Sequence, residues 1–215
     1  MHLLIPFSVC LVLAATAVGQ KPHPCESPPL MVGRASVIYP KREALVYERV
    51  TYDALGKRIR LRAQGVEHNQ SFYEDVLMLF REGVVYQISY KNQTCTKKPM
   101  DMPFQPIEIP QDATLQSQII LGSSSGPGQG LLVNNWMGEF PGQKVKYYMM
   151  FTEFGCIPVS TLYTSHEAGL ILLSFFDIVI GIEDPQDFIP PDFCETRRVD
   201  NELVVTDFFE ALKKN

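Results

Sequence analysis

The residues that could do covalent chemistry are few, and the most suggestive group is a loop rich in glycine and serine. The run Gly122-Ser123-Ser124-Ser125-Gly126 matches the G-x-S-x-G nucleophile elbow, with Ser124 as the nucleophile. Such an elbow needs a helix directly after the serine, but Pro127-Gly128 follows and starts no ordinary helix. In the usual chain order of the triad, the acid lies between the serine and the histidine. No aspartate lies between Ser124 and His166, so only Glu139 or Glu153 could serve as that acid. We therefore expect no catalytic residue, and a hydrolase is the weakest of the functions considered.

Metal ligands are also sparse. The histidines after the N-terminal apolar run are His23, His68 and His166. None has a second histidine or cysteine arranged as a zinc motif, which argues against a transition-metal site. Four acids cluster near the C-terminal end: Glu183, Asp184, Asp187 and Asp192. Oxygen ligands suit calcium, but the spacing is not that of an EF-hand, and a solvated acidic face explains the cluster equally well. We expect no required cofactor, with calcium at Glu183, Asp184 and Asp187 as an open alternative.

Three arginines alternate with apolar residues between positions 57 and 63. Arg58, Arg60 and Arg62 would lie on one face of a strand, and Ile59 and Leu61 on the other. This pattern allows an anion site, but it is typical of a sheet with one solvated face, which is the prediction we adopt.

Two sequons lie in polar breaks between apolar runs, Asn69-Gln70-Ser71 and Asn92-Gln93-Thr94. Glycans on Asn69 and Asn92 would require both breaks to be surface turns.

Length and composition indicate one secreted domain. The chain has 215 residues, 46% of them hydrophobic, and a net charge of −5. This acidity argues against nucleic acid, which requires a basic surface. Residues 1–19 form an apolar run ending in Ala17-Val18-Gly19, which predicts a signal peptide cleaved before Gln20 and a single domain over residues 20–215. A membrane anchor is the alternative, but the run is short for one, so we expect no transmembrane segment after cleavage.

Four cysteines remain after that cleavage: Cys25, Cys95, Cys156 and Cys194. An even number in a secreted chain predicts two disulfides, and the spacing leaves all three pairings open.

The body of the chain has the pattern of antiparallel strands joined by hairpins. The predicted strands are 44–52, 57–63, 72–80, 84–90, 114–121, 131–136, 144–154, 157–165 and 168–182. A proline-rich crossing is expected over residues 99–110, and one helix over Asp200–Lys214. The fold class is therefore mainly β.

The stretch Ala168–Ile182 stands out because both of its faces are apolar. Simple alternation places one set of side chains on one face: Leu170, Leu172, Phe176, Ile178, Ile180 and Ile182. It places Ile171, Leu173, Phe175 and Val179 on the other. A strand that is apolar on both faces is covered on both faces, so we predict a central strand with a core on one side and a cavity or partner on the other.

Several segments resemble the ependymin family, in particular the ependymin-related proteins of vertebrates. They are FFDIVIGIEDPQDFIPPDFC at residues 175–194, VLMLFREGVVYQISYKNQTC at 76–95, PFQPIEIP at 103–110, FGCIPV at 154–159, and Pro24-Cys25. The resemblance covers nearly the whole chain after the signal peptide.

The resemblance implies disulfides Cys25–Cys156 and Cys95–Cys194, without the third bridge found in many members. It implies a fold similar to bacterial lipoprotein carriers of the LolA type, in which two stacked, curved antiparallel sheets enclose an apolar pocket. It also implies a homodimer, a calcium-binding glycoprotein, and a location outside the cell or in the lysosomal lumen.

These observations favour a non-enzymatic protein that binds hydrophobic molecules, such as fatty acids or glycolipids, between its sheets. The residues alone are also compatible with a plain core, but several strands with two apolar faces favour a pocket, as does the resemblance. The predicted lining is Met78, Phe80, Tyr86, Ile88, Trp136, Tyr147, Met149, Phe151, Leu172, Phe176 and Ile178. A calcium-dependent adhesion or signalling glycoprotein is the alternative function.

Overall fold

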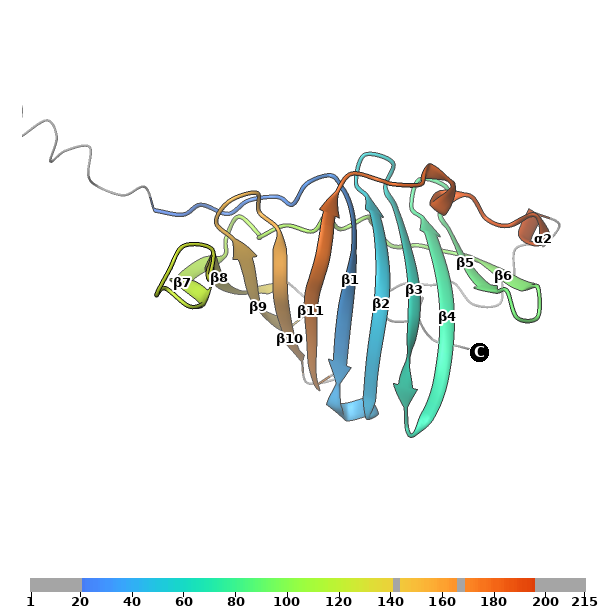
Figure 1. The fold of residues 1–215 in the computed structure, drawn as a ribbon. Helices are drawn as coiled ribbons and strands as arrows, with labels where there is room; N and C mark the ends of the chain where they lie inside the picture. The colour runs from blue at the N-terminus through green and yellow to red at the C-terminus, as the bar shows by residue number, and fades with distance from the viewer. Residues whose placement is uncertain (1–20, 141–143, 166–168, 196–215) are drawn as a thin grey trace, which may run out of the picture.

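The computed structural model describes residues 21–140, 144–165 and 169–195. Within them, eleven strands form one antiparallel sheet (Figure 1). The strands are β1 Leu30–Tyr39, β2 Ala44–Asp53, β3 Arg58–Glu67, β4 Gln70–Leu79, β5 Val84–Ser89, β6 Thr94–Pro99, β7 Thr114–Gly122, β8 Gly130–Phe140, β9 Val145–Thr152, β10 Pro158–Ser165 and β11 Gly169–Ile180. The short helices are η1 Pro40–Arg42, η2 Pro185–Phe188 and α2 Asp192–Glu195. The predicted signal peptide and the predicted helix Asp200–Lys214 lie outside the described residues.

The mainly β, antiparallel fold is confirmed, and its strands follow a simple order. The sheet runs β6-β5-β4-β3-β2-β1-β11-β10-β9-β8-β7, so two meanders are joined by the pairing of β1 with β11. The strands therefore make one continuous curved sheet, where the sequence analysis expected two stacked sheets. The stretch that is apolar on both faces supplies β11, which lies at the centre of the sheet as predicted.

A bulge in β11 changes which of its side chains share a face. Asp177 has a φ of 53°, and the register of β1 against β11 shifts between Val32 and Arg34. Val32 pairs with Val179 and Arg34 pairs with Phe176, so these two β11 residues lie on one face despite their odd spacing. The simple alternation predicted for Ile178 and Ile180 is therefore wrong, because the extra residue moves both to the face of Phe175.

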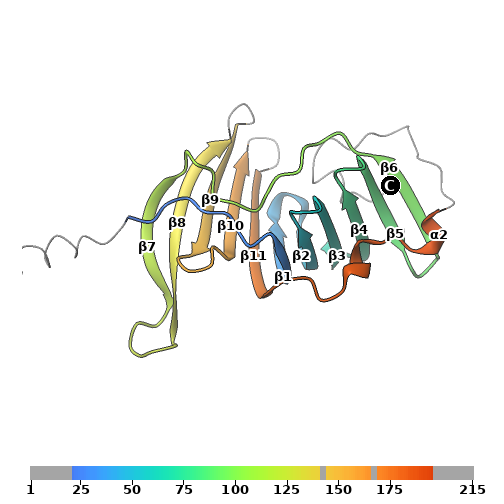
Figure 2. The same cartoon turned by 90° about the horizontal axis from the view of Figure 1, so that it is seen from above.

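Three segments cover the sheet. Residues 100–113 run along its concave side, and residues 181–194, which we call the strap, run along its convex side (Figures 1 and 2). Residues 21–29 lead into β1, and there the backbone N–H of Ile109 donates to the carbonyl of Cys25 at 3.0 Å. Apolar side chains of these segments pack against the faces of the sheet and shield them from water.

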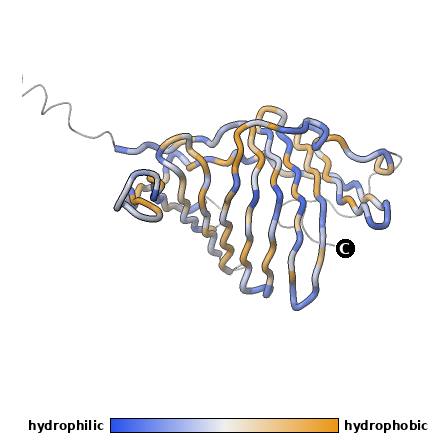
Figure 3. Tube along the Cα trace, in the orientation of Figure 1, coloured by the Kyte–Doolittle hydropathy of each residue, from blue (hydrophilic) through white to orange (hydrophobic). Residues whose placement is uncertain are grey.

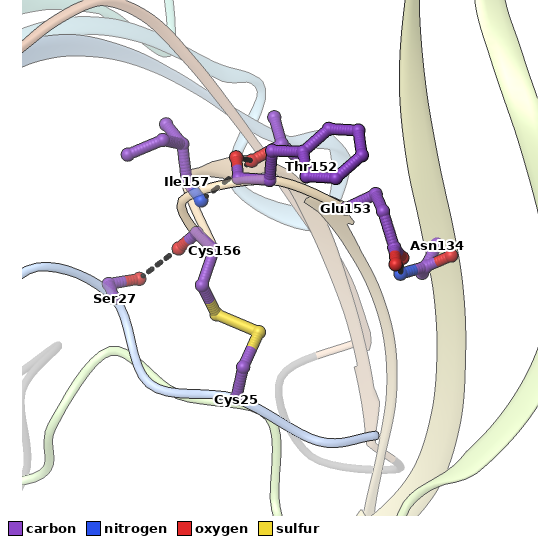
Figure 4. The surroundings of a disulfide bond; sticks show 8 residues. Cys25, Ser27, Asn134, Thr152, Glu153, Cys156 and Ile157 are labelled. Atoms are coloured by element: carbon purple, nitrogen blue, oxygen red, sulfur yellow. Dashed lines mark hydrogen bonds between the residues drawn. A yellow bond between two sulfur atoms is a disulfide. The ribbon is translucent and has the colours of Figure 1, made fainter. Parts of the chain in front are cut away.

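Two disulfides fasten these covering segments, with the pairing that the family resemblance implied. Cys25–Cys156 ties residues 21–29 to the turn between β9 and β10, where Ser27 Oγ also donates to the Cys156 carbonyl at 3.0 Å (Figure 4). Cys95–Cys194 ties the end of the strap to the edge strand β6. Both asparagines of the sequons are exposed in turns, as glycan acceptors must be, and their glycosylation remains a prediction.

Replacing both Cys95 and Cys194 by serine is expected to lower the free energy of unfolding. The bridge closes a loop of 99 residues, for which the chain-entropy model gives a contribution of about 4.7 kcal/mol. Guanidinium denaturation followed by circular dichroism measures the change. A double variant with unchanged stability would show that the strap is held without the disulfide.

Candidate functional site

The concave face is the candidate site, and the strand register defines which side chains belong to it. Residues directly opposite one another in an antiparallel sheet share a face. One apolar row crosses the sheet in this way: Phe72, Gly65, Val46, Val37, Leu173, Thr161, Met149, Trp136 and Leu115. The row runs from β4 to β7 without a charged residue.

The two ends of the concave face are filled by packed side chains. Under β3 to β5, Leu61, Val76 and Met78 pack with Met100 from the crossing segment 100–113. Under β8 to β10, Trp136, Tyr147, Met149 and Phe151 pack with Ile109. Crossing residues therefore close both ends of the face.

The predicted pocket residues are divided among separate places. Met78 and Phe80 belong to the first of these clusters, and Trp136, Tyr147, Met149 and Phe151 to the second. Tyr86 and Ile88 lie on the convex face, where they pack against Phe188 of the strap. Leu172 and Phe176 also face the convex side, and Phe176 is 38% exposed. Ile178 lines a small crevice on the concave side.

That crevice lies where the crossing segment meets the centre of the sheet. It is lined by residues including Met31, Val50, Tyr52, Ile107 and Phe175, and its volume of about 10 Å³ is that of a single water. The backbone N–H of Ile107 donates to Tyr52 Oη at 3.0 Å, which holds the crossing segment against β2. The part of the concave face around Met31 and Tyr52, which we call its upper part, is therefore closed in this structure.

The lower part of the concave face is less covered. Four side chains of the apolar row, on the strands next to and beyond Gly65, are only partly buried. They are Phe72, Val46, Val37 and Leu173. Gly65 has no room for a side chain, because a Cβ there would lie 2.4 Å from the carbonyl oxygen of Leu45. The next row also contains small residues, Ala35 and Ala63, and both are buried.

A buried carboxyl lies in that next row and was not anticipated from the sequence. Glu48 is 7% exposed and is paired across the sheet with Ala35 and Ala63; Glu74 follows on β4. Burial, followed by repulsion from Glu74, raises the pKa of Glu48 to about 7. Burial also raises the pKa of Tyr163, another residue of the concave face, to about 12. Both shifts come from the burial of these two side chains themselves.

The convex face carries a buried charge network that corrects the prediction of a solvated arginine face. Arg60 is 2% exposed and donates to both oxygens of Asp75 at 2.8 Å. It also donates to the Asp187 carbonyl at 2.8 Å, and Arg62 donates to the Asp187 carboxylate at 2.6 Å. The strap covers Arg60 fully and Arg62 in part, which the alternation within one strand could not show.

The acids considered for calcium have partners within the protein. Asp187 accepts from Arg62 and from Thr51 Oγ1, Asp184 caps η2 by accepting from the Gln186 N–H, and Glu183 lies 3.5 Å from Arg49. Burial alone would raise the pKa of Asp187, but the hydrogen bonds from Arg62 and Thr51 outweigh it and lower that pKa. Among the described residues no group of three acids, histidines or cysteines is arranged to hold a metal. Calcium binding therefore stays a prediction.

The serine loop joins two strands, not a strand and a helix. Ser124 is exposed between β7 and β8, and β8 starts at Gly130. An elbow nucleophile is held at a strand-to-helix turn, so this loop lacks that support. His166 lies outside the described residues.

Comparison with known proteins assigns the chain to a family. A family model described as Ependymin matches residues 68–194. Ependymin-2 of Carassius auratus is 36% identical over 193 residues, which cover 90% of this chain and 88% of the relative. The chain belongs to the ependymin family.

Other members of the family give similar matches. Ependymin of Notemigonus crysoleucas is 36% identical over 193 residues, with the same coverage of 90% and 88%. Ependymin-1 of Oncorhynchus mykiss is 32% identical over 191 residues, covering 87% of this chain and 86% of the relative. These matches extend the family assignment beyond the segment that the family model covers.

A solved structure shares the fold at much lower identity. An uncharacterised conserved protein from Thermus thermophilus has a TM-score of 0.50 and 10% identity, covering 86% of this chain and 97% of that protein. The two disulfides of this ependymin-family chain are typical of folding in an oxidising compartment. No helix in the part of the chain that the structure describes is long and apolar enough to cross a membrane.

Glu48→Gln is expected to remove a pH dependence of stability. Because the folded pKa of about 7 exceeds the ordinary 4.5, the folded state binds the proton more tightly, and stability falls as pH rises from 4.5 to 7. The variant should be more stable than wild type above pH 7, by roughly 2–3 kcal/mol. Urea denaturation at several pH values measures this, with the exposed Glu82→Gln as control. Parallel pH profiles for wild type and Glu48→Gln would contradict the assignment.

Asp187→Ala is expected to loosen the strap. It leaves the buried hydroxyl of Thr51 and the partly buried guanidinium of Arg62 without this acceptor, at a cost of about 1–3 kcal/mol. Hydrogen exchange at the strap amides, with the exposed Asp192→Ala as control, should show faster exchange only in Asp187→Ala. Equal exchange in both variants would mean that the disulfide alone holds the strap.

Proposed function

We propose that this ependymin-family chain binds hydrophobic molecules, such as fatty acids or glycolipids, on its concave face without catalysing a reaction. The observation that carries the proposal is the partly buried apolar row Phe72, Val46, Val37 and Leu173 on that face. Neighbouring strands lie about 4.8 Å apart, so the row from β4 to β11 spans about 19 Å, which suits an extended acyl chain.

The energetics of this row support binding. Each methylene removed from water contributes about 0.8 kcal/mol, so about ten give 8 kcal/mol before association costs are subtracted. Gly65, Ala63 and Ala35 add little side-chain bulk beside this row. A ligand would displace water from side chains that the protein leaves half covered.

Polar groups near the row could orient an amphiphilic ligand. Trp136 Nε1 and Tyr147 Oη are buried donors with no partner in the described structure, and both belong to the aromatic cluster at the β8–β10 end. Glu48, with its pKa of about 7, lies on the same face in the cross-strand row next to the apolar row. We infer that the chain acts outside the cell or in the lysosomal lumen, as its disulfides and family suggest.

Val46→Asp and Leu173→Asp are expected to abolish ligand binding, because an unpaired carboxylate on an apolar surface is costly to desolvate. Titration with a fluorescent fatty acid measures affinity, and circular dichroism checks the fold. Leu55→Asp is the control, since Leu55 is 62% exposed in the turn between β2 and β3 and belongs to neither apolar row. Equal loss of binding in the control, or saturable binding in both concave variants, would contradict the site.

We further propose that the convex face mediates a homodimer. A second cross-strand row consists of Val66, Leu45, Ile38, Leu172, Leu162, Tyr148 and Met137. Ile38 is 41% and Met137 46% exposed, although both are apolar. The adjoining row contains Ser36, Ser174 and Ser160, whose small side chains allow a second sheet to approach. Hydrophobic residues lie mainly on the strands and hydrophilic ones in the turns (Figure 3).

Ile38→Arg combined with Leu172→Arg is expected to give a monomer, because two charges would face the partner's apolar row. Light scattering coupled to size exclusion measures the mass. Leu55→Arg, in an exposed turn, is the control and should leave the dimer intact. A wild-type monomer at micromolar concentration would contradict the dimer without affecting the ligand site.

A further inference from the structure

The two edges of the sheet are protected very differently. The edge strand β6 contains Lys97, Lys98 and Pro99, and its Cys95 is bonded to Cys194 in α2. Charged residues, proline and a covering element are the means by which proteins prevent another strand from pairing with an edge.

The opposite edge, β7, has none of these protections in its sequence. It contains no proline, and no charged residue occurs between Asp112 and Glu139. β7 pairs with β8 on one side, and no described strand pairs with its other side. A bulge between Leu115 and Ser117 interrupts the ladder, so the regular open edge is residues 117–122.

The backbone of this edge is oriented for pairing. The Ser123 N–H donates to the Gln129 carbonyl at 3.0 Å, which begins the ladder between β7 and β8. Inward and outward groups alternate along an antiparallel strand, so the N–H and C=O of Ile120 point away from β8. The open edge therefore presents backbone donors and acceptors in the spacing of a strand.

Apolar side chains flank that edge on both faces of the sheet. Ile119 and Leu121 lie on one face and Ile120 on the other, and they are 39%, 44% and 47% exposed. The end of the β7–β8 hairpin projects beyond the rest of the sheet (Figure 2). A partner strand laid along this edge would meet apolar side chains above and below the new backbone hydrogen bonds.

We propose that residues 117–122 of β7 bind an extended, uncharged segment of another protein by strand addition. Only an extended backbone satisfies a row of alternating donors and acceptors. A lipid surface fits poorly, because unpaired backbone groups are costly in hydrocarbon. A second copy fits poorly too, because pairing two copies through residues 117–122 alone is short for a stable dimer of roughly 1,200 Å² or more, whereas a transient contact with an extended segment can be smaller. The inference is independent of ligand binding on the concave face.

The test uses a capped hexapeptide of alternating threonine and valine as the probe. Titration calorimetry with the intact protein should show saturable binding, and amide NMR shifts should concentrate in β7. The same peptide N-methylated at every residue should not bind, because it cannot form the ladder. Ile120→Pro removes the outward N–H and should weaken binding about tenfold or more, whereas Ile120→Ala keeps it and should bind nearly as wild type.

Three outcomes would overturn the proposal. They are equal binding of the peptide by Ile120→Pro with an intact fold, binding to phosphatidylcholine vesicles that competes with the peptide, and β7-to-β7 crosslinking of two Ser117→Cys copies without peptide. Retained fatty-acid binding in Ile120→Pro would show that any loss is confined to the edge.

Discussion

The structure depends on covering a sheet that is apolar on both faces. The pairing of β1 with β11 joins two meanders into one sheet, and its central strand has no polar face. An open sheet of this kind must bury apolar side chains on two sides at once. The crossing segment covers the ends of the concave side and the strap covers part of the convex side, which leaves the apolar row around Val46 and the row around Ile38 only partly covered.

The strap shows how charge can serve the same purpose as apolar cover. It brings Asp187 over Arg60 and Arg62, while Asp75 satisfies Arg60 from the neighbouring strand. Buried ion pairs gain little net stability compared with an apolar core, but removing one partner is costly. The network therefore favours one position of the strap over others, and the Cys95–Cys194 disulfide fixes its end.

Much of the fold could be predicted because its signals are local. Alternation marked the strands, turn residues marked the hairpins, and the central strand was identifiable from its two apolar faces. What failed depended on pairing with segments distant in sequence. Arg60 is buried by a strap more than a hundred residues away, and Ile178 changes face because of a bulge at Asp177 that is visible only in the register against β1.

The site was predicted only in part, for the same reason. Tyr86 and Ile88 had suitable composition for a pocket, but register places them on the convex face. Glu48 gave no signal, because a single glutamate in a polar-looking strand resembles any exposed residue. The register pairs Glu48 with Ala35 and Ala63, and Ala63 in turn with Glu74 on the next strand. Only this register shows that Glu48 faces the concave side.

The most direct measurement is mass spectrometry of organic extracts from the purified, fully disulfide-bonded protein. If the concave face is a binding site for hydrophobic molecules, the extract of wild type should contain lipid in near-stoichiometric amount, and the extract of a variant with a charge in the row around Val46 should not. Wild-type protein that carries no lipid, and that takes up none when incubated with mixed lipid vesicles, would contradict the account.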